Sequence, residues 1–539
     1  MSFSDYHFDT LHALVLCALV LTGSIYVFYP RRRVGLPPGP PSRWLLGTKM
    51  PSGVLSWVAF ATWTQQYGPL FTLGLGAGER LIVVGTYKAA IELLERHAPA
   101  FADRPRSIAA GEVLSGGMRT LMIPKGERIK KLRRALLMSL QPAASAVHKP
   151  VQAKAARIAL LDVLRRPDAF VDHYRKYAAS VIMHITYGKC APTRVADADV
   201  RAVNACLARV SRALMPGAWA VDALPWLPEG AVQALRGELE GLGWGMRWGA
   251  KLLLRLGYME ELRKGHEFEL GLFRGKLEEV KKAMDAGRAV PCFATQVLQA
   301  REALGLSFDE CAYLCGSQFG AGSDTSASYI AVAIMAAALC PEAQKRAQAE
   351  LDAVVGKDRC PSFEDQENLP YVSAFAQEVG RWRPVAAGGV QHRATEDVVH
   401  DGYVIPKGSR ILGNHWSIHH DPEVFPEPEC FRPERWLTED NKLRTDIRTF
   451  TFGFGRRACP GNHVADRSVF INLALILWAL DIAEDPAAPI DSMAFEPLAT
   501  TRPKPFQPLI RPRAHLTAAG IRDVLLREDP TLEEGWLAV

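Results

Sequence analysis

One cysteine in this chain stands in a setting that favours metal chemistry. Cys459 follows Arg457 by two residues, and three glycines in the stretch 452–461 free the backbone around it. Residues 462–480 are predicted to form a helix, with Pro460 suited to its first turn. A helix N-terminus and a nearby cation both favour the thiolate form of a cysteine. A single thiolate held in this way suits axial ligation of a haem iron, whereas the alternative is a buried structural cysteine.

The spacing of residues around Cys459 favours the haem ligand. The pattern F-x-x-G-x-R-x-C-x-G, from Phe452 to Gly461, fixes five positions, and a chance match in a chain of this length has a probability on the order of 10⁻⁴. It is the haem-binding signature of the cytochrome P450 family, which this chain resembles over about residues 30–513. The resemblance implies a mainly α fold with a small β part. It also implies haem b as the cofactor, with Cys459 as the axial iron ligand and with Phe452, Arg457 and Gly461 in the binding site.

A second motif lies in the middle of a long predicted helix. Ser307 and Glu310 form a capping box and Pro341 closes the far end, which together predict a helix over residues 307–340. Within it, residues 321–326 read Ala-Gly-Ser-Asp-Thr-Ser and interrupt a run of good helix formers. The hydroxyl of Thr325 can bond back to the carbonyl of residue 321 and widen the helix locally.

This interruption has a functional reading and a structural one. Ala321 and Gly322 are small and leave room beside the helix, where dioxygen would fit over a haem. The segment matches the oxygen-activation pattern of the cytochrome P450 family, [AG]-G-x-[DE]-T-[ST]. The resemblance implies that Thr325 and Asp324 are catalytic and relay protons during dioxygen activation. A merely kinked structural helix is the alternative, and the presence of Cys459 favours the functional reading.

A third set of residues is predicted to be structural. Glu378 and Arg381 match E-x-x-R, a pattern too common to be informative alone, since Glu260 and Arg263 match it as well. Arg435 follows in a Pro-Glu-Arg-Trp run at the distance seen in the family. The resemblance therefore implies a buried triad of Glu378, Arg381 and Arg435 that locks the core behind the haem. Removing one member would leave an uncompensated buried charge.

The helix predicted near residues 126–137 combines an apolar stripe with a basic face. Ile129, Leu132 and Leu136 recur at helical spacing, and Arg133 lies on their side. In the family this helix carries W-x-x-x-R, which holds a haem propionate. Because Ile129 replaces the tryptophan, only Arg133 can inherit that role here. The resemblance adds Arg457 and His392 as further propionate partners.

The outward cations of this helix have two readings. Lys130, Lys131 and Arg134 point away from the stripe, and in the family this surface is where an acidic reductase docks. A simple solvated helix face is the alternative, and the sequence does not separate the two.

The predicted substrate pocket is uncharged and mostly apolar, which favours a lipophilic small molecule. The family layout places residues 384–390 along the cavity. The pocket candidates are Phe319, Ala321, Val385, Val390, Thr500 and Thr501. The run 380–421 is similar to fungal microsomal enzymes of secondary metabolism, which suggests a terpenoid or polyketide intermediate as substrate. Residues 215–256, with four tryptophans, resemble the family's lid over the substrate channel, although ordinary core packing is the alternative.

The N-terminal region predicts a membrane protein. Residues 11–29 are almost wholly apolar and, as a helix, span roughly 28 Å, about the thickness of a hydrocarbon core. Three arginines follow at 31–33 and no Lys or Arg precedes the run, so the positive-inside rule places the rest of the chain in the cytosol. We expect an anchor over 1–33 in the endoplasmic reticulum membrane, a proline-rich hinge over 34–42, one monooxygenase domain over 43–513 and a tail over 514–539, either loosely helical or disordered.

Composition and charge exclude several other classes. The net charge of +6 in 539 residues is too small to indicate nucleic-acid binding, and 48% hydrophobic content is ordinary for a large globular core. The ten cysteines show no C-x-x-C pair, which agrees with a reduced, cytosol-facing protein.

Taken together, these features predict a membrane-anchored haem-thiolate monooxygenase. It would hydroxylate or epoxidise its substrate with dioxygen and with electrons that NADPH-cytochrome P450 reductase supplies from NADPH, since this chain carries no flavin motif of its own. Two alternatives are a haem-thiolate isomerase or dehydratase and a non-catalytic haem-binding sensor. The Asp324–Thr325 pair argues against both.

Overall fold

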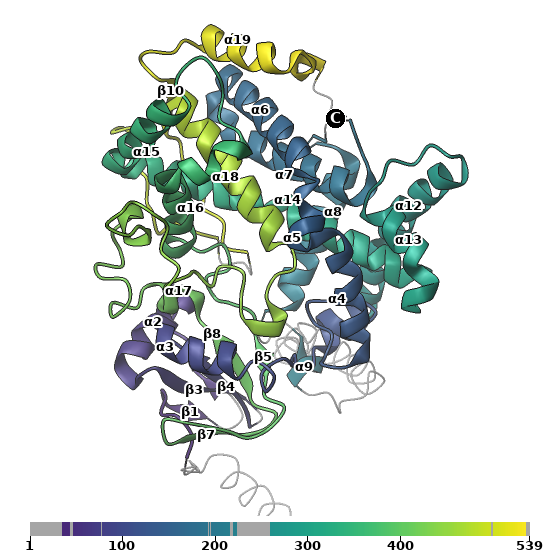
Figure 1. Cartoon of the computed structure of the whole chain (residues 1–539). Helices are drawn as coiled ribbons and strands as arrows, with labels where there is room; N and C mark the ends of the chain where they lie inside the picture. Colours follow the sequence, from purple (N-terminus) through teal and green to yellow (C-terminus); the bar gives the residue numbers. More distant parts are fainter. Residues whose placement is uncertain are drawn as a thin grey trace, which may run out of the picture. The chain divides into compact units, whose positions relative to one another are not determined.

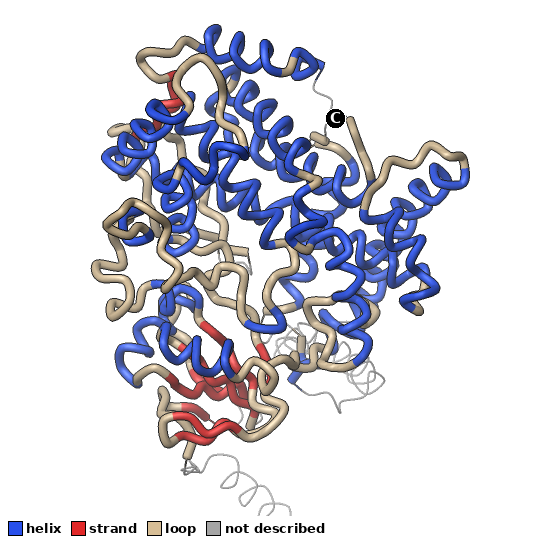
Figure 2. Tube along the Cα trace, viewed as in Figure 1, coloured by secondary structure: helices blue, strands red, loops and turns tan. Residues whose placement is uncertain are grey.

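Helices dominate the computed structural model and strands are few and short (Figure 2). The structure describes residues 35–43, 47–76, 78–191, 193–194, 196–215, 219–223, 259–496 and 500–534. The chain divides into two compact units, one of residues 1–103 with 390–418 and the other of residues 104–389 with 419–539. The predicted mainly α fold with a small β part is therefore confirmed. The predicted membrane helix over 11–29 lies outside the described residues.

The first unit is built on a four-stranded mixed sheet with the order β3-β4-β8-β5 (Figure 1). β3 (Leu70–Gly76) and β4 (Glu79–Val84) are antiparallel, β8 (Arg410–Gly413) runs parallel to β4, and β5 (His392–Arg393) is antiparallel to β8. Alternate residues of β3 and β4 pack against α2 (Ser56–Tyr67) through Phe60. The smaller elements are β1 (Ser42–Arg43), β2 (Gly47–Thr48), α3 (Tyr87–Ala90), η1 (Ile91–Arg96), β6 (Val398–His400), β7 (Tyr403–Ile405) and, at the unit boundary, α17 (His415–His419).

The second unit is organised around α14 (Phe308–Leu339). Ser307 and Glu310 form the predicted capping box, with the Glu310 N–H donating to the Ser307 hydroxyl at 3.1 Å. Of the 32 residues in α14, 22 are buried, because α7 (Phe170–Tyr187), α8 (Ala198–Ala213), α12 (Met259–Asp285) and α18 (Asn462–Ala479) pack around it. The helix predicted over 307–340 is thus found almost to the residue.

Shorter elements complete the second unit. They are η2 (Ile108–Leu114), α4 (Glu127–Leu140), α5 (Pro142–Ala146), α6 (Lys149–Arg165), η3 (Pro167–Ala169), α9 (Ala220–Ala223), α13 (Phe293–Leu304), α15 (Pro341–Val354), η4 (Phe363–Asn368), α16 (Pro370–Trp382), η5 (Pro433–Trp436), η6 (Gly455–Arg457), β9 (Leu480–Ala483), β10 (Leu509–Pro512), α19 (Ala518–Glu528) and η7 (Pro530–Glu534). Within the described residues no single helix is long and apolar enough to cross a membrane. The pair α14 and α15, bent by 105°, reaches that length and composition only when the two are taken together.

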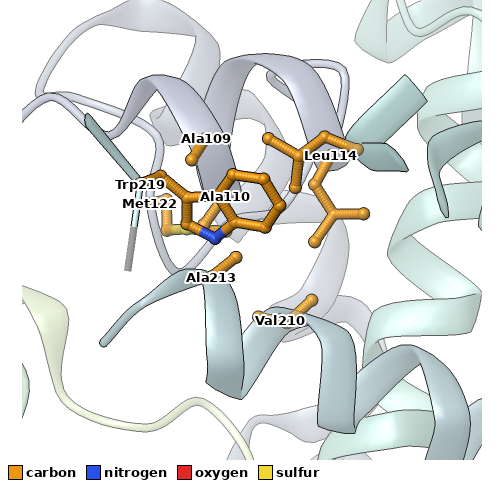
Figure 3. Packing of buried hydrophobic residues seen from close by; sticks show 8 residues of the cluster. Ala109, Ala110, Leu114, Met122, Val210, Ala213 and Trp219 are labelled. Atoms are coloured by element: carbon orange, nitrogen blue, oxygen red, sulfur yellow. The ribbon is translucent and has the colours of Figure 1, made fainter. Parts of the chain in front are cut away.

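One tryptophan of the predicted lid region lies in the core. Trp219 is 8% exposed, and its indole packs among alanines and aliphatic side chains of η2 and α8 (Figure 3). The neighbouring Asp222 accepts hydrogen bonds from the N–H groups of Ile108 and Ala109, at 2.6 and 3.1 Å, and so fastens the start of η2. Core packing therefore accounts for Trp219, whereas the other three tryptophans of that region lie outside the described residues.

The C-terminal tail contains an ordered helix. In α19 the side chains of Ile521 and Leu525 are fully buried, and the helix packs against α6. Glu528, its last residue, accepts a hydrogen bond from the N–H of Cys360 at 2.8 Å and one from Arg157 at 2.9 Å. Of the two alternatives left open for this tail, the structure shows a helix held by buried apolar contacts.

Candidate functional site

The loop that carries Cys459 is shaped by glycines and closed by a backbone hydrogen bond. Gly453 and Gly455 have φ angles of +78° and +48°, a conformation that favours glycine. The N–H of Cys459 donates to the carbonyl of Phe452 at 2.8 Å. Gly461 differs from the other two, because its φ is −92° and it is the N-cap of α18. Helix α18 begins at Asn462. Pro460 therefore lies just before the helix, whereas the sequence predicted it in the first turn.

The Cys459 side chain has accessible surface although it lies deep among protein atoms. Desolvation raises the pKa of its thiol, and a backbone hydrogen bond from Gly461 and the positive charge of Arg133 lower that pKa, while Asp466 raises it. The net direction is upward, so protein contacts alone do not favour the thiolate that the sequence predicts. A coordinated metal ion deprotonates a thiol outright. The site therefore suits a cysteine whose ionisation is driven by metal binding.

Two arginines flank the cysteine loop in different ways. The Nη2 of Arg133, in α4, donates to the carbonyl of Ala458 at 3.0 Å, directly before the cysteine. The Nη2 of Arg457 donates to the carbonyl of Ile123 at 2.8 Å. The sequence named Arg457 as the cation beside the sulfur, and the structure adds Arg133, whose charge acts on the Cys459 thiol. Sequence spacing could not find this, because 326 residues separate the two side chains along the chain.

The apolar stripe of α4 explains how Arg133 is aimed. Ile129, Leu132 and Leu136 are all buried, as the helical spacing predicts. Arg133 sits on the same side and is half-buried, and desolvation lowers the pKa of its guanidinium. Lys131 and Arg134 are exposed, and exposed Lys130 donates to Glu127 at 2.6 Å.

The middle of α14 exposes one turn of an otherwise buried helix. Ala321 and Thr325 are exposed, whereas most residues on either side of this turn are buried. The Thr325 hydroxyl donates to the Ala321 carbonyl at 2.9 Å, as predicted. The helix nevertheless stays α-helical throughout. The expected room at Gly322 is taken by a neighbour, since a Cβ there would lie 2.6 Å from Ile182 of α7. Gly322 thus serves close helix packing, and only the Ala321–Thr325 turn is accessible.

The second predicted relay residue, Asp324, faces a different side of α14. Its side chain is buried, and its Oδ2 lies 3.1 Å from the Nε of Arg502. Desolvation raises the pKa of this carboxyl, and Arg502 and Arg175 oppose the increase. Arg502 could not be predicted as a partner, because it lies 178 residues away in the chain.

The predicted pocket residues fall into separate environments. The N–H of Thr501 donates to the carbonyl of Val385 at 2.6 Å, and the N–H of Ala387 donates to the Thr501 hydroxyl at 3.2 Å, so these two segments meet. Thr500 is half-buried. Phe319 is fully buried with its ring edge-on to Tyr187 at 6.2 Å, which makes it a core residue. Val390 is exposed and belongs to the first unit.

His392 also belongs to the first unit, in β5. Its side chain is buried, and its Nδ1 lies 2.7 Å from the carbonyl of Phe101. A carbonyl oxygen can only accept, so Nδ1 carries a proton. It follows that Nε2 is an acceptor in the neutral ring and donates to a carboxylate only when His392 is protonated.

The predicted triad is part of a larger buried cluster. Glu378 and Arg381 are fully buried and form a two-pronged ion pair at 2.7 and 2.8 Å. Arg435 donates to Glu378 at 3.0 Å. The sequence missed the indole of Trp436 and the N–H of Arg432, which also donate to Glu378, both at 2.9 Å. Arg381 in turn donates to the carbonyls of His419, Pro428 and Cys430. One carboxylate therefore fixes α16 to η5 and to the backbone just before it.

This cluster predicts a large stability effect at one position. Glu378→Ala removes the acceptor of five hydrogen bonds and leaves Arg381 buried without its carboxylate. We expect the free energy of unfolding to fall by about 3–5 kcal/mol, measured by urea unfolding with circular dichroism. The control is Glu342→Ala, which removes an exposed pair with Lys345 and should cost less than about 1 kcal/mol. Equal losses of unfolding free energy in the two variants would show that the buried cluster stabilises the fold no more than an exposed ion pair does.

The described residues fit a haem held by one cysteine. Cys459 is accessible, and Arg133 and Arg457 are cations beside its loop. The accessible turn of α14 lies in the same unit. In the part of the chain that the structure describes, no group of three or more His, Cys, Asp or Glu residues could hold a metal ion. A porphyrin with a single protein thiolate needs no such group.

Comparison with known proteins identifies the family. The cytochrome P450 family model matches residues 37–227 and 255–510. The chain is 48% identical over 484 residues to cytochrome P450 monooxygenase 113 of Postia placenta, covering 90% of this chain and 92% of that protein. It is 46% identical over 506 residues to monooxygenase 88 of the same fungus, with coverage of 93% and 97%. A cytochrome P450 monooxygenase of Armillaria gallica is 35% identical over 513 residues, with coverage of 93% and 94%. The chain therefore belongs to the cytochrome P450 family and is a haem-thiolate monooxygenase.

Proposed function

We propose that this enzyme hydroxylates or epoxidises a lipophilic intermediate of fungal secondary metabolism, a terpenoid or a polyketide, with dioxygen and NADPH-derived electrons. The observation that carries the proposal is the accessible Ala321–Thr325 turn in the otherwise buried α14, in the same unit as the accessible Cys459. A hydroxyl on an accessible turn is able to pass protons, and an accessible cysteine is able to bind a metal. The uncharged pocket candidates and the fungal relatives support the substrate class.

Residues of the Cys459 loop and a nearby arginine would hold haem b. Cys459 would bind the iron, and Arg133 and Arg457 of the same unit would bind the propionates, with Phe452 and Gly461 in the same binding loop. Arg133 donates to the carbonyl of Ala458 and Arg457 to the carbonyl of Ile123, and the planar guanidinium with its five N–H donors is suited to bind a carboxylate. Haem bound through a thiolate supplies the activation of dioxygen and the insertion of one oxygen atom.

The protein's own contribution would be to place protons. The Thr325 hydroxyl now donates to the Ala321 carbonyl. Its lone pairs accept a proton while it gives up its own, so it acts as a relay without changing its charge. Asp324 is the neighbouring carboxyl that would supply protons to the Thr325 hydroxyl.

Electrons would come from NADPH-cytochrome P450 reductase, a separate flavoprotein. The exposed Lys131 and Arg134 of α4, together with Lys130, form the basic surface we propose for its docking. Complementary charge accelerates such encounters and makes them sensitive to salt.

We also propose that residues 1–33 anchor the enzyme in the endoplasmic reticulum membrane, with the catalytic part in the cytosol. The apolar run over 11–29 and the three arginines after it support this placement.

Deletion of residues 1–33 tests the anchor. We expect the shortened protein to remain in the supernatant when microsomes are sedimented, because the apolar run is lost, while the full chain sediments. Washing with high salt separates insertion from charge attraction. A shortened protein that stays with the membranes after that wash would contradict the anchor.

Thr325→Ala tests the monooxygenase proposal. Without the hydroxyl, proton supply fails, so the share of NADPH electrons recovered as product should fall and the share recovered as hydrogen peroxide should rise, by roughly 10-fold or more in their ratio. Both are measured in a system reconstituted with the reductase.

The matched control is Thr325→Ser, which keeps a hydroxyl and should keep most of the product yield. An unchanged product-to-peroxide ratio in Thr325→Ala would overturn the relay. Product formed without NADPH would point to an isomerase or dehydratase.

A further inference from the structure

The carboxylate of Asp324 is held by a cation from a distant loop. Asp324 is 9% exposed, and its Oδ2 lies 3.1 Å from the Nε of Arg502. A buried carboxylate beside a guanidinium is favoured in its ionised form. Asp324 thus forms an ion pair on one side of α14, while the Thr325 hydroxyl donates a hydrogen bond to the Ala321 carbonyl on the accessible side.

A hairpin brings Arg502 to this position. The N–H of Glu496 donates to the carbonyl of Arg502 at 2.9 Å, and the N–H of Lys504 donates to the carbonyl of Ala494 at 2.8 Å. Thr501, directly before Arg502, is joined to residues 385 and 387 by the two hydrogen bonds described above. The hairpin therefore links the predicted pocket residues to Asp324.

A second carboxylate competes for the same guanidinium. An Oε2 of Glu496 lies 3.9 Å from the Nε of Arg502. Among the described residues, this buried Nε–H has no hydrogen-bond partner, although Asp324 is close. The contact with Asp324 is thus an ion pair without the alignment of a hydrogen bond, which makes it easier to open.

The charges around Asp324 act in opposite directions. Burial is the largest influence and raises the pKa of its carboxyl; Arg502 on the hairpin and Arg175 on α7 lower that pKa, and Glu496 on the hairpin raises it. Arg175 also donates to Asp172 at 3.3 Å. These are the charged groups that face Asp324 from the hairpin and from α7.

We propose that Arg502 is a positioning residue for proton delivery. It holds Asp324 ionised on the hairpin side of α14, and Glu496, by competing for the guanidinium, sets how readily Asp324 is released to take a proton from solvent and pass it to Thr325. The inference rests on the relay of the proposed function.

Two charge-removing variants should have opposite effects. If Asp324 must take up a proton before passing it on, the product share falls as pH rises through its pKa. Arg502→Gln removes a charge that lowers this pKa, so the decrease in product share should occur at higher pH. Glu496→Gln removes a charge that raises the pKa of Asp324 and leaves Arg502 to pair with Asp324 alone. The decrease in product share should therefore occur at lower pH. The measurement is the product-to-peroxide ratio against pH.

Two controls accompany the pair. Arg502→Lys keeps the positive charge and should stay near the wild-type profile. Asp324→Asn should abolish this dependence of the product share on pH. Shifts in the same direction for Arg502→Gln and Glu496→Gln, or no shift in either, would overturn the inference, because a merely structural role of Arg502 does not produce shifts of opposite sign.

A readout without turnover separates this inference from the proposed function. Infrared difference spectra of the haem-loaded protein report the protonated carboxyl of Asp324 as a band that is absent in Asp324→Asn. Its titration should move to higher pH in Arg502→Gln and to lower pH in Glu496→Gln. If no variant or wild type makes product with NADPH, the proposed function fails while this titration still decides the role of Arg502. A band that does not respond to either variant overturns the inference.

Discussion

Desolvation of one sulfur is the constraint on which the site depends. The Cys459 thiol lies deep enough for burial to raise its pKa, and the Gly461 hydrogen bond and the charge of Arg133 only partly offset that effect. A coordinated metal ion deprotonates a thiol outright and would stabilise the thiolate here. The rest of the loop keeps the sulfur accessible for that partner, through positive φ angles at Gly453 and Gly455 and the bond from Cys459 to Phe452.

The elements around this loop are arranged so that rigid packing surrounds a small accessible surface. Glu378 gathers α16, Trp436 and the backbone before η5 into one buried cluster. In α14 most residues are buried against neighbouring helices, and the turn of Ala321 and Thr325 is exposed. The Thr325 hydroxyl in this turn is satisfied locally by its hydrogen bond to the Ala321 carbonyl.

Local patterns predicted the elements well. The capping box at Ser307 located α14, and the spacing of Ile129, Leu132 and Leu136 located the buried stripe of α4. The return bond from Thr325 was also predictable, because it joins residues four apart. Each of these features depends on groups within one or two helical turns, where sequence spacing and geometry are directly related.

Contacts between distant segments were not predictable in the same way. The small residue at Gly322 was taken for open space, but Ile182 of α7 fills it. The partner of Asp324 is Arg502, and the charge of Arg133, from a distant helix, acts on Cys459. Nothing in the local sequence marks these pairs, because tertiary packing alone decides which side chains meet.

The absorption spectrum of the reduced protein with carbon monoxide tests the central claim most directly. Thiolate ligation predicts a red-shifted Soret band in the wild type and in Cys430→Ala, which changes another exposed cysteine, and loss of that band in Cys459→Ala. A Cys459→Ala protein that keeps the red-shifted band, or a wild type that binds no haem on reconstitution, would contradict the account.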